Sequence, residues 1–386
     1  MLAVADVLLR NQSALVRTLT EIATHASATD EINRSLMALA GAAWEIERAR
    51  PPNTGTISVF HPSNNVLYAY VLYAVIPCLF ANRVVVRPSA RATRPVLDVH
   101  GLITNSVEVT TVTQREFLST VAGSDVVVFT GRYDNALSVA GGLRRDQLLV
   151  YFGGGLNPIV VGAEADLEAA ARDSVRARLY NSGQDCLCPD VIFVQDSVSE
   201  VFMRALLHEL TPIRLAESRT EVGARLAPIY YYDILPRLER FLEGCQDRIV
   251  FGGHIDRAAQ TVQPTVLVSD LDAQPVETEF FAPVFNVVRY RQPEALRNWL
   301  LSKRAVEHAM YLSVYGEPEL AARLSPPYTV CTAEIPLDVE HGNRPFGGFG
   351  VRAGFAQTNG AREGRPLLIS GEVARAERGA LRPAVQ

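Results

Sequence analysis

The residues best suited to chemistry in this chain surround Cys186. They read Asn-Ser-Gly-Gln-Asp-Cys over residues 181–186, just ahead of an apolar run at 191–194. A cysteine on a loop can act as a thiolate nucleophile toward a carbonyl carbon. A glycine-rich turn at 152–158 lies upstream, and glycines let a backbone approach a nucleotide closely. Together these features predict covalent carbonyl chemistry beside a nucleotide site.

The elements around these residues alternate between helix and strand. In the first series, helices are favoured at 1–50 and 66–79, and strands at 56–60, 83–86, 107–112, 125–129 and 147–151. In the second, helices are favoured at 167–179 and 197–210, and strands at 191–194, 248–252, 265–268, 285–290, 309–314 and 329–331. Such alternation predicts α/β units with parallel sheets. Residues 366–375 read as an isolated strand, and such strands often pair with another domain or subunit.

The composition argues against several classes of function. The 386 residues are 48% hydrophobic with a net charge of −5 and scattered basic residues, so no nucleic-acid or membrane partner is predicted. The five cysteines are odd in number and widely spread, which favours a reducing cytoplasm over a disulfide framework. Cys186 and Cys188 lack a second ligand pair at zinc spacing, so no metal site is predicted. The first 26 residues read as an amphipathic helix rather than a signal peptide.

Seven short motifs stand in one order along the chain. They are residues 62–64 (Pro-Ser-Asn), 86–89 (Val-Arg-Pro-Ser), 129–131 (Phe-Thr-Gly), 153–158, 184–186 (Gln-Asp-Cys), 279–284 (Glu-Phe-Phe-Ala-Pro-Val) and 345–350 (Pro-Phe-Gly-Gly-Phe-Gly). Each motif is weak alone, but from about residue 50 to 370 the series resembles the aldehyde dehydrogenase superfamily, and in particular its acylating, acyl-thioester reductase-like branch.

The resemblance implies an architecture. It implies an α/β fold with a Rossmann-like nucleotide domain, an α/β catalytic domain and a small oligomerisation flap. We expect the nucleotide domain at 1–152, with a flap segment near 44–58, and the catalytic domain at 153–343. Residues 344–386 would then form a return segment and an oligomerisation strand. A homodimer or larger homo-oligomer follows as an expectation.

The resemblance also implies roles for individual residues. Cys186 is the expected nucleophile, and the Asn64 amide is expected to hold the oxyanion together with the Cys186 backbone N–H. The residues expected to contact the cofactor are Pro62, Ser63, Arg87, Ser89, Gly131, Arg132, Gly153, Gly154, Glu279 and Phe281. Simpler interpretations stay open, namely a buried structural cysteine, an Asx-turn at Asn64 and a solvated Glu279. Cys188 is interpreted as a packing residue.

One departure from the family pattern bears on the reaction. Phe152 stands where hydrolytic members carry the glutamate that activates water, and phenylalanine cannot act as a base. A thiol acceptor such as coenzyme A or an acyl carrier protein needs no such base. Asp185 is a candidate for a relocated base, although its charge would also disfavour the thiolate. Leu156 replaces a family lysine, a second departure that bears on cofactor geometry.

The cofactor and the reaction follow as expectations. Arg87 and Arg132, with Ala90 where NAD-preferring members often carry an acid, favour NADP over NAD because guanidinium groups bind phosphate well. The alternative is that Arg87 and Arg91 are surface charges. The leading hypothesis is an NAD(P)-dependent enzyme that interconverts an acyl thioester and an aldehyde through Cys186. An aldehyde dehydrogenase that forms a carboxylic acid and a non-catalytic binding subunit are the alternatives.

Overall fold

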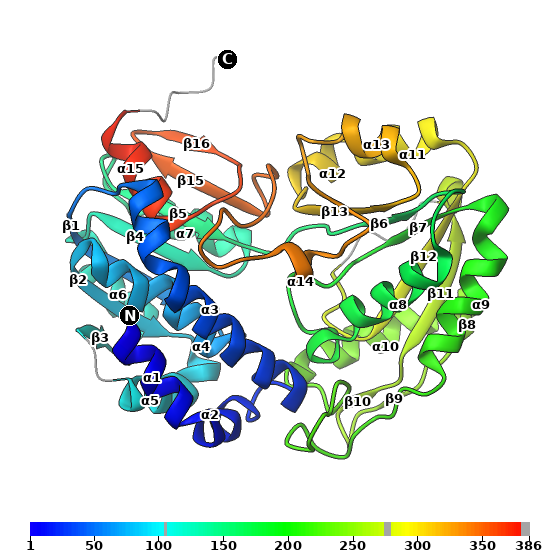
Figure 1. Cartoon of the computed structure of the whole chain (residues 1–386), viewed down its shortest axis with the longest axis horizontal. Coiled ribbons are helices and arrows are strands. Elements are labelled where there is room, and N and C mark those ends of the chain that lie inside the picture. Colours follow the sequence, from blue (N-terminus) through cyan, green and yellow to red (C-terminus); the bar gives the residue numbers. More distant parts are fainter. Residues whose placement is uncertain (104–105, 274–278, 380–386) are drawn as a thin grey trace.

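The computed structural model describes residues 1–103, 106–273 and 279–379. Figure 1 shows one lobe built around strands β1 to β5, β15 and β16, and beside it a second lobe built around β6 to β8 and β11 to β14. Each lobe has a twisted sheet covered by helices. Within the described residues, no helix is long and apolar enough to cross a membrane.

The first sheet has a reversal in its strand order. Its spatial order is β16 (Ala361–Glu363), β15 (Gly354–Thr358), β5 (Leu148–Phe152), β4 (Val126–Thr130), β1 (Thr54–His61), β2 (Ala81–Pro88) and β3 (Val107–Val109). The strands β1 to β5 run parallel, and chain order reverses between β1 and β4. Ligands of open α/β sheets bind in the crevice that such a reversal leaves at the carboxyl ends of the strands.

The second sheet is parallel apart from one edge. Its spatial order is β14 (Thr329–Thr332), β13 (Tyr311–Tyr315), β6 (Ile159–Val161), β7 (Ile192–Gln195), β12 (Val284–Tyr290), β11 (Thr265–Asp270) and β8 (Ile249–Phe251). Only β8 among these strands pairs antiparallel, with β11. The short strands β9 (Ile255–Asp256) and β10 (Thr261–Val262) form a separate hairpin. Most central strands are rich in valine and isoleucine, as expected for strands covered on both faces.

Helices cover both sheets. The first lobe contains α1 (Leu2–Arg10), α2 (Gln12–Leu19), α3 (His25–Ala49), α4 (Val66–Tyr70), α5 (Thr93–Leu102), α6 (Gln114–Ala122), α7 (Tyr133–Gly141) and α15 (Ile369–Glu377). The second contains α8 (Leu167–Arg178), α9 (Ser199–Leu210), α10 (Leu235–Glu243), α11 (Pro293–Leu300), α12 (Lys303–Glu307), α13 (Pro318–Arg323) and α14 (Pro336–Val339). The helical path of α4 continues through a π turn and a 3-10 turn to Leu79.

The long helix α3 connects the fold to the site. Residues at helical spacing along it are buried, including Ala28, Ile32, Leu39 and Ala42. This stripe packs into the core of the first lobe, against residues of α1, α2 and α4. Glu31 lies on the same buried stripe, so α3 also brings a carboxylate into the interior.

The sequence-based expectations for α/β elements are confirmed, including the helices before residue 50 and the strand runs of both series. Two expectations are wrong. Residues 44–58 form no flap, because they comprise the end of α3 and the first half of the central strand β1. Residues 366–375 form no isolated strand, because Ile369–Glu377 is helix α15.

The return segment rejoins the first lobe. Strand β15 pairs antiparallel with β5, and β16 pairs antiparallel with β15 at the sheet edge. Helix α15 then docks on α3, where Ser370 Oγ donates a 2.7 Å hydrogen bond to Glu45 Oε1. A buried ion pair between Arg365 and Glu372 fixes the start of this helix. Residues 354–377 therefore pack on their own chain, and the isolated strand expected at 366–375 is not formed.

Candidate active site

The loop that carries Cys186 has a strained backbone. Asn181 and Ser182 have left-handed φ angles of 48° and 56°, and Gly183 follows with a φ of 80°. A side chain on Gly183 would place its Cβ 2.5 Å from the backbone of Ala282, so only glycine fits there. Backbone strain of this kind concentrates at functional sites. The loop turns Cys186 toward a cavity while its neighbours remain buried.

Two buried side chains fix this loop. Asn157 Nδ2 donates a 2.7 Å hydrogen bond to the carbonyl oxygen of Cys186. The guanidinium of Arg178, which is 1% exposed, donates to the carbonyl oxygens of Gly183 and Ala282. Arg178 thus joins the cysteine loop to the turn that carries Phe281. Because both contacts are buried, the position of Cys186 relative to that turn is well determined.

One cavity between the lobes brings the expected catalytic residues together. Its lining includes Cys186, Asn64, Pro62, Gly153 and Phe152. Asn64 and Pro62 follow strand β1, and Phe152 ends strand β5. The side chain of Phe152 stacks on Tyr73, with ring centroids 5.0 Å apart and an angle of 17° between the rings. Phe152, which the sequence resemblance places where a base is expected, therefore forms an apolar part of the cavity wall.

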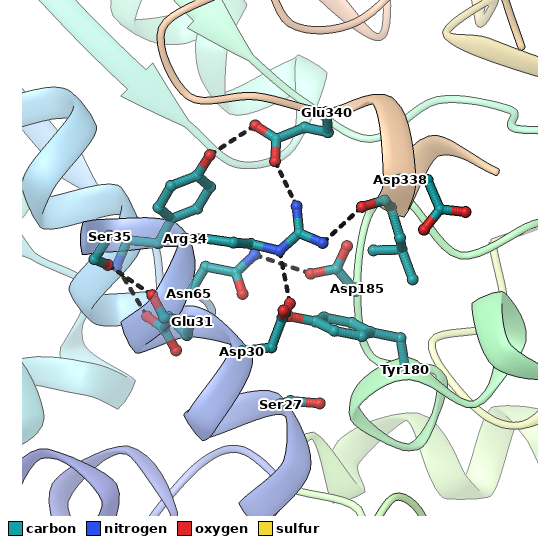
Figure 2. A network of polar contacts seen from close by, with 12 residues as sticks. Ser27, Asp30, Glu31, Arg34, Ser35, Asn65, Tyr180, Asp185, Asp338 and Glu340 are labelled. Atoms are coloured by element: carbon teal, nitrogen blue, oxygen red, sulfur yellow. Dashed lines mark hydrogen bonds and ion pairs between the residues drawn. The ribbon is translucent and has the colours of Figure 1, made fainter. Parts of the chain in front are cut away.

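A network of charged side chains lines the same cavity (Figure 2). Arg34 on α3 donates to Asp30 Oδ2 at 2.6 Å and to Glu340 Oε2 at 2.8 Å. Tyr68 on α4 donates to the other oxygen of Glu340 at 2.8 Å. Glu340 thus has both oxygens engaged. The network joins residues more than 300 positions apart in the chain.

Asp185, which precedes the expected nucleophile Cys186 in the chain, also has both carboxylate oxygens in hydrogen bonds. Its Oδ2 accepts a 2.9 Å hydrogen bond from Asn65 Nδ2, and its Oδ1 accepts a 2.8 Å bond from the Leu187 N–H. Asn65 can reach it because this residue adopts a left-handed φ of 51° at the start of α4. Both carboxylate oxygens therefore have partners, although Asp185 lines the cavity.

Burial dominates the electrostatics of these groups. The surrounding protein raises the pKa of the Cys186 thiol well above its ordinary value, and the charges of Asp185 and Glu279 raise it further. Burial likewise raises the pKa of Asp185 and of Glu340, and it raises the pKa of Glu31 to about 7. Burial and the neighbouring carboxylates therefore favour the neutral thiol of Cys186 over its thiolate.

The expected cofactor residues lie along one edge of the first sheet. Ser63 follows β1, Arg87 and Ser89 lie at the end of β2, Gly131 and Arg132 follow β4, and Gly153 and Gly154 follow β5. Because the parallel strands β1, β2, β4 and β5 end at this edge, the residues share the crevice at the strand reversal. Their individual roles remain predictions.

The crevice fits a dinucleotide in two respects. Gly131 has a φ of +150°, which a residue with a side chain rarely adopts, at the start of helix α7. A Cβ on Gly154 would stand 2.9 Å from Glu279 Oε1, so glycine leaves room for the carboxylate and a ligand beside it. Phe281 also lies in this region, 5.6 Å from the ring of Tyr231. This local geometry is compatible with a nucleotide in the crevice.

Sequence reasoning missed the charged wall of the cavity and the tyrosine segment at 230–232. Arg34, Tyr68 and Glu340 carry no motif, and each reads as an ordinary helix or loop residue. Residues 230–232 are three consecutive tyrosines, but the sequence alone does not show whether they lie in the core or at the surface. Among the described residues, no cluster of three or more metal-ligating side chains is found.

The model of the aldehyde dehydrogenase family matches residues 8–300. The chain belongs to this family. Family membership and the sheet topology confirm the expected fold, and the family is one of oxidoreductases. The finer assignment to the acylating branch belongs to the proposal below.

Individual relatives are distant. The 4,4'-diapolycopene-4,4'-dial dehydrogenase of Cytobacillus firmus is 24% identical over 310 residues, which cover 75% of this chain and 67% of that protein. The chain spans half the length or less of several other curated relatives. The structure of the glyceraldehyde-3-phosphate dehydrogenase GapN from Methanocaldococcus jannaschii, complexed with NADP, has a TM-score of 0.80 at 18% identity, covering 97% of this chain and 85% of that one. A betaine aldehyde dehydrogenase from Staphylococcus aureus in complex with NAD⁺ has a TM-score of 0.77 at 18% identity, covering 96% and 81%.

Proposed function

We propose that this chain is an NAD(P)-dependent oxidoreductase that interconverts an acyl thioester and an aldehyde through Cys186. The observation that supports this most is Phe152, an apolar residue that lines the same cavity as Cys186 and stacks on Tyr73. The nearby carboxylates of Asp185 and Glu340 have both oxygens engaged in hydrogen bonds. Because these two carboxylates are engaged and Phe152 cannot act as a base, a thiol is favoured over water as the acyl acceptor, since a thiolate needs no general base.

The chain's own residues would act as follows in the reductive direction. The Cys186 thiol gives up its proton, Sγ attacks the thioester carbon and forms a new C–S bond, and the carrier sulfur leaves with the electron pair of the broken C–S bond and takes up that proton. A reduced nicotinamide, when bound, supplies a hydride to the acyl carbon. The oxyanion collapses to the aldehyde and expels Cys186 as a thiolate. The sum consumes one thioester, one hydride and one proton, and it yields an aldehyde and a free thiol.

Asn64 is proposed to stabilise the oxyanion in both tetrahedral intermediates. It lies in the cavity lining with Cys186, at the end of the rigid strand β1. Loss of one such hydrogen-bond donor typically costs about 3 kcal/mol of transition-state stabilisation. The use of NAD(P) is supported by the family and by the nucleotides in the two related structures. Coenzyme A or an acyl carrier protein would supply the thiol.

A second function is favoured by a different observation. Several buried carboxylates line the cavity, and burial raises the pKa values of Asp185 and Glu340. A carboxylate with a raised pKa can act as a general base near neutral pH. If one of them activates water after a rearrangement of its partners, the product is a carboxylic acid. A non-catalytic binding role is the third candidate, supported by the raised pKa of the Cys186 thiol, which disfavours the nucleophilic thiolate.

A paired assay of nicotinamide absorbance separates these functions. One arm contains acyl-CoAs with NADPH or NADH, and the other contains aldehydes with NADP or NAD, with and without free CoA. Oxidation of the reduced cofactor by acyl-CoA, or aldehyde oxidation only with CoA, is the expected result, and Cys186→Ala must abolish it. Equal aldehyde oxidation without CoA would overturn the thioester proposal in favour of acid formation. Inactivity in both arms with folded protein would support the binding role.

A further inference from the structure

A segment of the catalytic lobe crosses the crevice that is proposed to hold the cofactor. This segment, Tyr230 to Asp233, is called the clasp. Its base is tied to the nucleophile loop, because Gln184 Oε1 accepts 3.0 Å hydrogen bonds from the N–H groups of Tyr230 and Tyr231. The far end of the clasp reaches the nucleotide lobe. The clasp therefore links the reacting end of the site to the edge where the nucleotide would bind.

Two contacts fix the clasp over the carboxyl ends of β1 and β2. The hydroxyl of Tyr231 lies 2.9 Å from Ser63 Oγ, and its ring packs edge-on against Phe281. Asp233 accepts two hydrogen bonds from Arg91, at 2.8 and 2.9 Å, in a bidentate ion pair between the lobes. The guanidinium of Arg91 also lies 5.6 Å from the Tyr231 ring centroid. Arg91 follows directly after Ala90, beside the end of β2.

Asp233 faces more than one positive charge across the crevice. Its hydrogen bonds with Arg91 lower the pKa of its carboxyl group most, and the charge of Arg132 lowers it further. Arg132 begins helix α7, directly after Gly131. Asp233 is therefore ionised at neutral pH. It supplies Arg91 and Arg132 with a nearby carboxylate that the local sequence around them does not contain. The side chains of Asp233 and Arg91 are 50% and 48% exposed, so a ligand entering from solvent can contact both.

We infer that Asp233 is a specificity-determining residue that disfavours a 2′-phosphate on the adenosine ribose and so favours NAD over NADP. A 2′-phosphate would have to displace Asp233 from Arg91, and it would meet the carboxylate charge at short range. A ribose 2′-hydroxyl can instead donate to a carboxylate, as acidic residues do in NAD-binding sites. Asp233 belongs to the lobe opposite Arg91 and lies 142 residues from it in the chain, so local sequence around Arg91 does not reveal this carboxylate.

This inference rests on the proposed function only in requiring that the chain binds a nicotinamide dinucleotide. It opposes the sequence-based expectation of an NADP preference. In the sequence, no partner of Arg91 is visible. In the fold, its guanidinium is paired with Asp233 and is therefore not free to bind a 2′-phosphate. Binding, rather than turnover, is the quantity that the inference predicts.

Dissociation constants for NADH and NADPH, measured by cofactor fluorescence with the full chain, test it. Asp233→Asn keeps the shape of the side chain and removes its charge. We expect this variant to lower the Kd for NADPH relative to that for NADH on the order of fivefold, the upper range for half-exposed charge interactions. Arg91→Ala should weaken NADPH binding in the Asp233→Asn background, because the freed guanidinium is then the phosphate ligand. Asp233→Ser serves as a second variant should the asparagine distort the clasp.

The control is Asp270→Asn, which breaks an exposed Asp–Arg pair with Arg289 far from the crevice edge and must leave the ratio unchanged. A ratio in Asp233→Asn and Asp233→Ser equal to that of the wild type would overturn the inference while the proposed function stands. Absence of binding of either dinucleotide to the folded wild-type chain would overturn both.

Discussion

At the scale of single residues, the environment of the expected nucleophile Cys186 disfavours its ionised, thiolate form. Burial and nearby carboxylates raise the pKa of the Cys186 thiol, and Phe152 in the same cavity offers no proton acceptor. An oxidised nicotinamide would bring positive charge into this crevice and favour the thiolate. In the direction of aldehyde oxidation, this coupling would keep the nucleophile inactive until the cofactor binds. Phe152 and Asp185 are the two residues whose substitution tests the balance directly.

Replacement of Phe152 should change the reaction. Phe152→Glu introduces a carboxylate into the cavity lining beside Cys186, where burial will raise its pKa toward neutrality and suit it to general base catalysis. We expect acid formation from aldehyde without a thiol acceptor to rise by about tenfold or more, measured as carboxylate product and reduced cofactor. The control is Phe152→Gln, because glutamine has nearly the shape of glutamate but no carboxylate that could act as a base. Equal rates for the two variants would contradict the explanation.

The thiol's ionisation can be read from its chemical reactivity. In the protein without cofactor, alkylation of Cys186 by iodoacetamide should be slow at pH 7 and should accelerate as the pH rises above 9, because the pKa is raised. Asp185→Asn removes a negative neighbour and should shift this profile to lower pH. Each unit of pKa decrease raises the thiolate fraction about tenfold. Peptide mass mapping gives the rate, and the half-buried Cys78 is an internal control that must not change.

At the scale of elements, helix α3 carries the polar side of the site into the core. Glu31 Oε1 accepts hydrogen bonds from the N–H groups of Leu67 and Tyr68, at 2.5 and 3.0 Å. These are free donors of the first turn of α4, so Glu31 acts as a cap for α4 supplied by another helix. Arg34, one turn later on α3, holds Glu340 and Asp30. The cap and the ion network together set how α4 presents Asn65 and Tyr68.

The buried carboxyl of Glu31 makes stability depend on pH. Its pKa is about 7 in the folded chain, above the 4.5 of an unperturbed group. The folded state therefore holds this proton more tightly, and stability falls as the pH rises from 4.5 through 7. Glu31→Gln can accept the same bonds without a charge. At pH 8 the free energy of unfolding of Glu31→Gln should exceed that of the wild type by about 3 kcal/mol, measured by denaturant unfolding.

The comparison at acidic pH supplies the control. Near pH 4.5 the wild-type Glu31 is protonated in the folded state, so the gap between wild type and Glu31→Gln should nearly close. Glu294→Gln, an exposed glutamate paired with Arg297, should show no pH-dependent gap. A gap of the same size at both pH values would mean that Glu31 is charged in the folded chain throughout, against this account.

At the scale of the whole molecule, the site exists only between the lobes. The cavity takes Asn64, Phe152 and Tyr68 from the first lobe, and Cys186 and Glu340 from elsewhere in the chain. The return segment closes the arrangement, since β15 extends the first sheet after the chain has formed the second. A dinucleotide in the crevice would contact both lobes. Its binding free energy would therefore stabilise their docking.

Dinucleotide binding should raise the melting temperature of the full chain. A ligand at 100 times its Kd stabilises the folded state by about 2.7 kcal/mol. Gly131→Val places a branched side chain at a φ of +150° beside α7, so it should abolish this shift. Gly141→Ala, on the same helix in open space, should retain the shift. Retention of the full shift by Gly131→Val would argue against a nucleotide at this edge.

Much of this protein could be read from its sequence, because local patterns carry that information. Runs of β-branched residues separated by helical periodicity were sufficient to predict the α/β lobes. The order of short motifs was sufficient to predict the family, and Phe152 stood out as a departure within that order. Cys186 and Asn64 were candidates from their motifs, and they do line one cavity.

Only the tertiary structure decided the rest, because it depends on contacts between distant residues and on burial. The apolar tail at 366–375 suits a strand or a helix, and docking on α3 through Ser370 and Glu45 makes it a helix. The ion network from Arg34 to Glu340 joins residues 306 positions apart, which no local pattern can reveal. Asp233 likewise meets Arg91 only after two lobes have folded and docked. Charges that are isolated in the sequence acquire their partners, and hence their chemistry, from the fold.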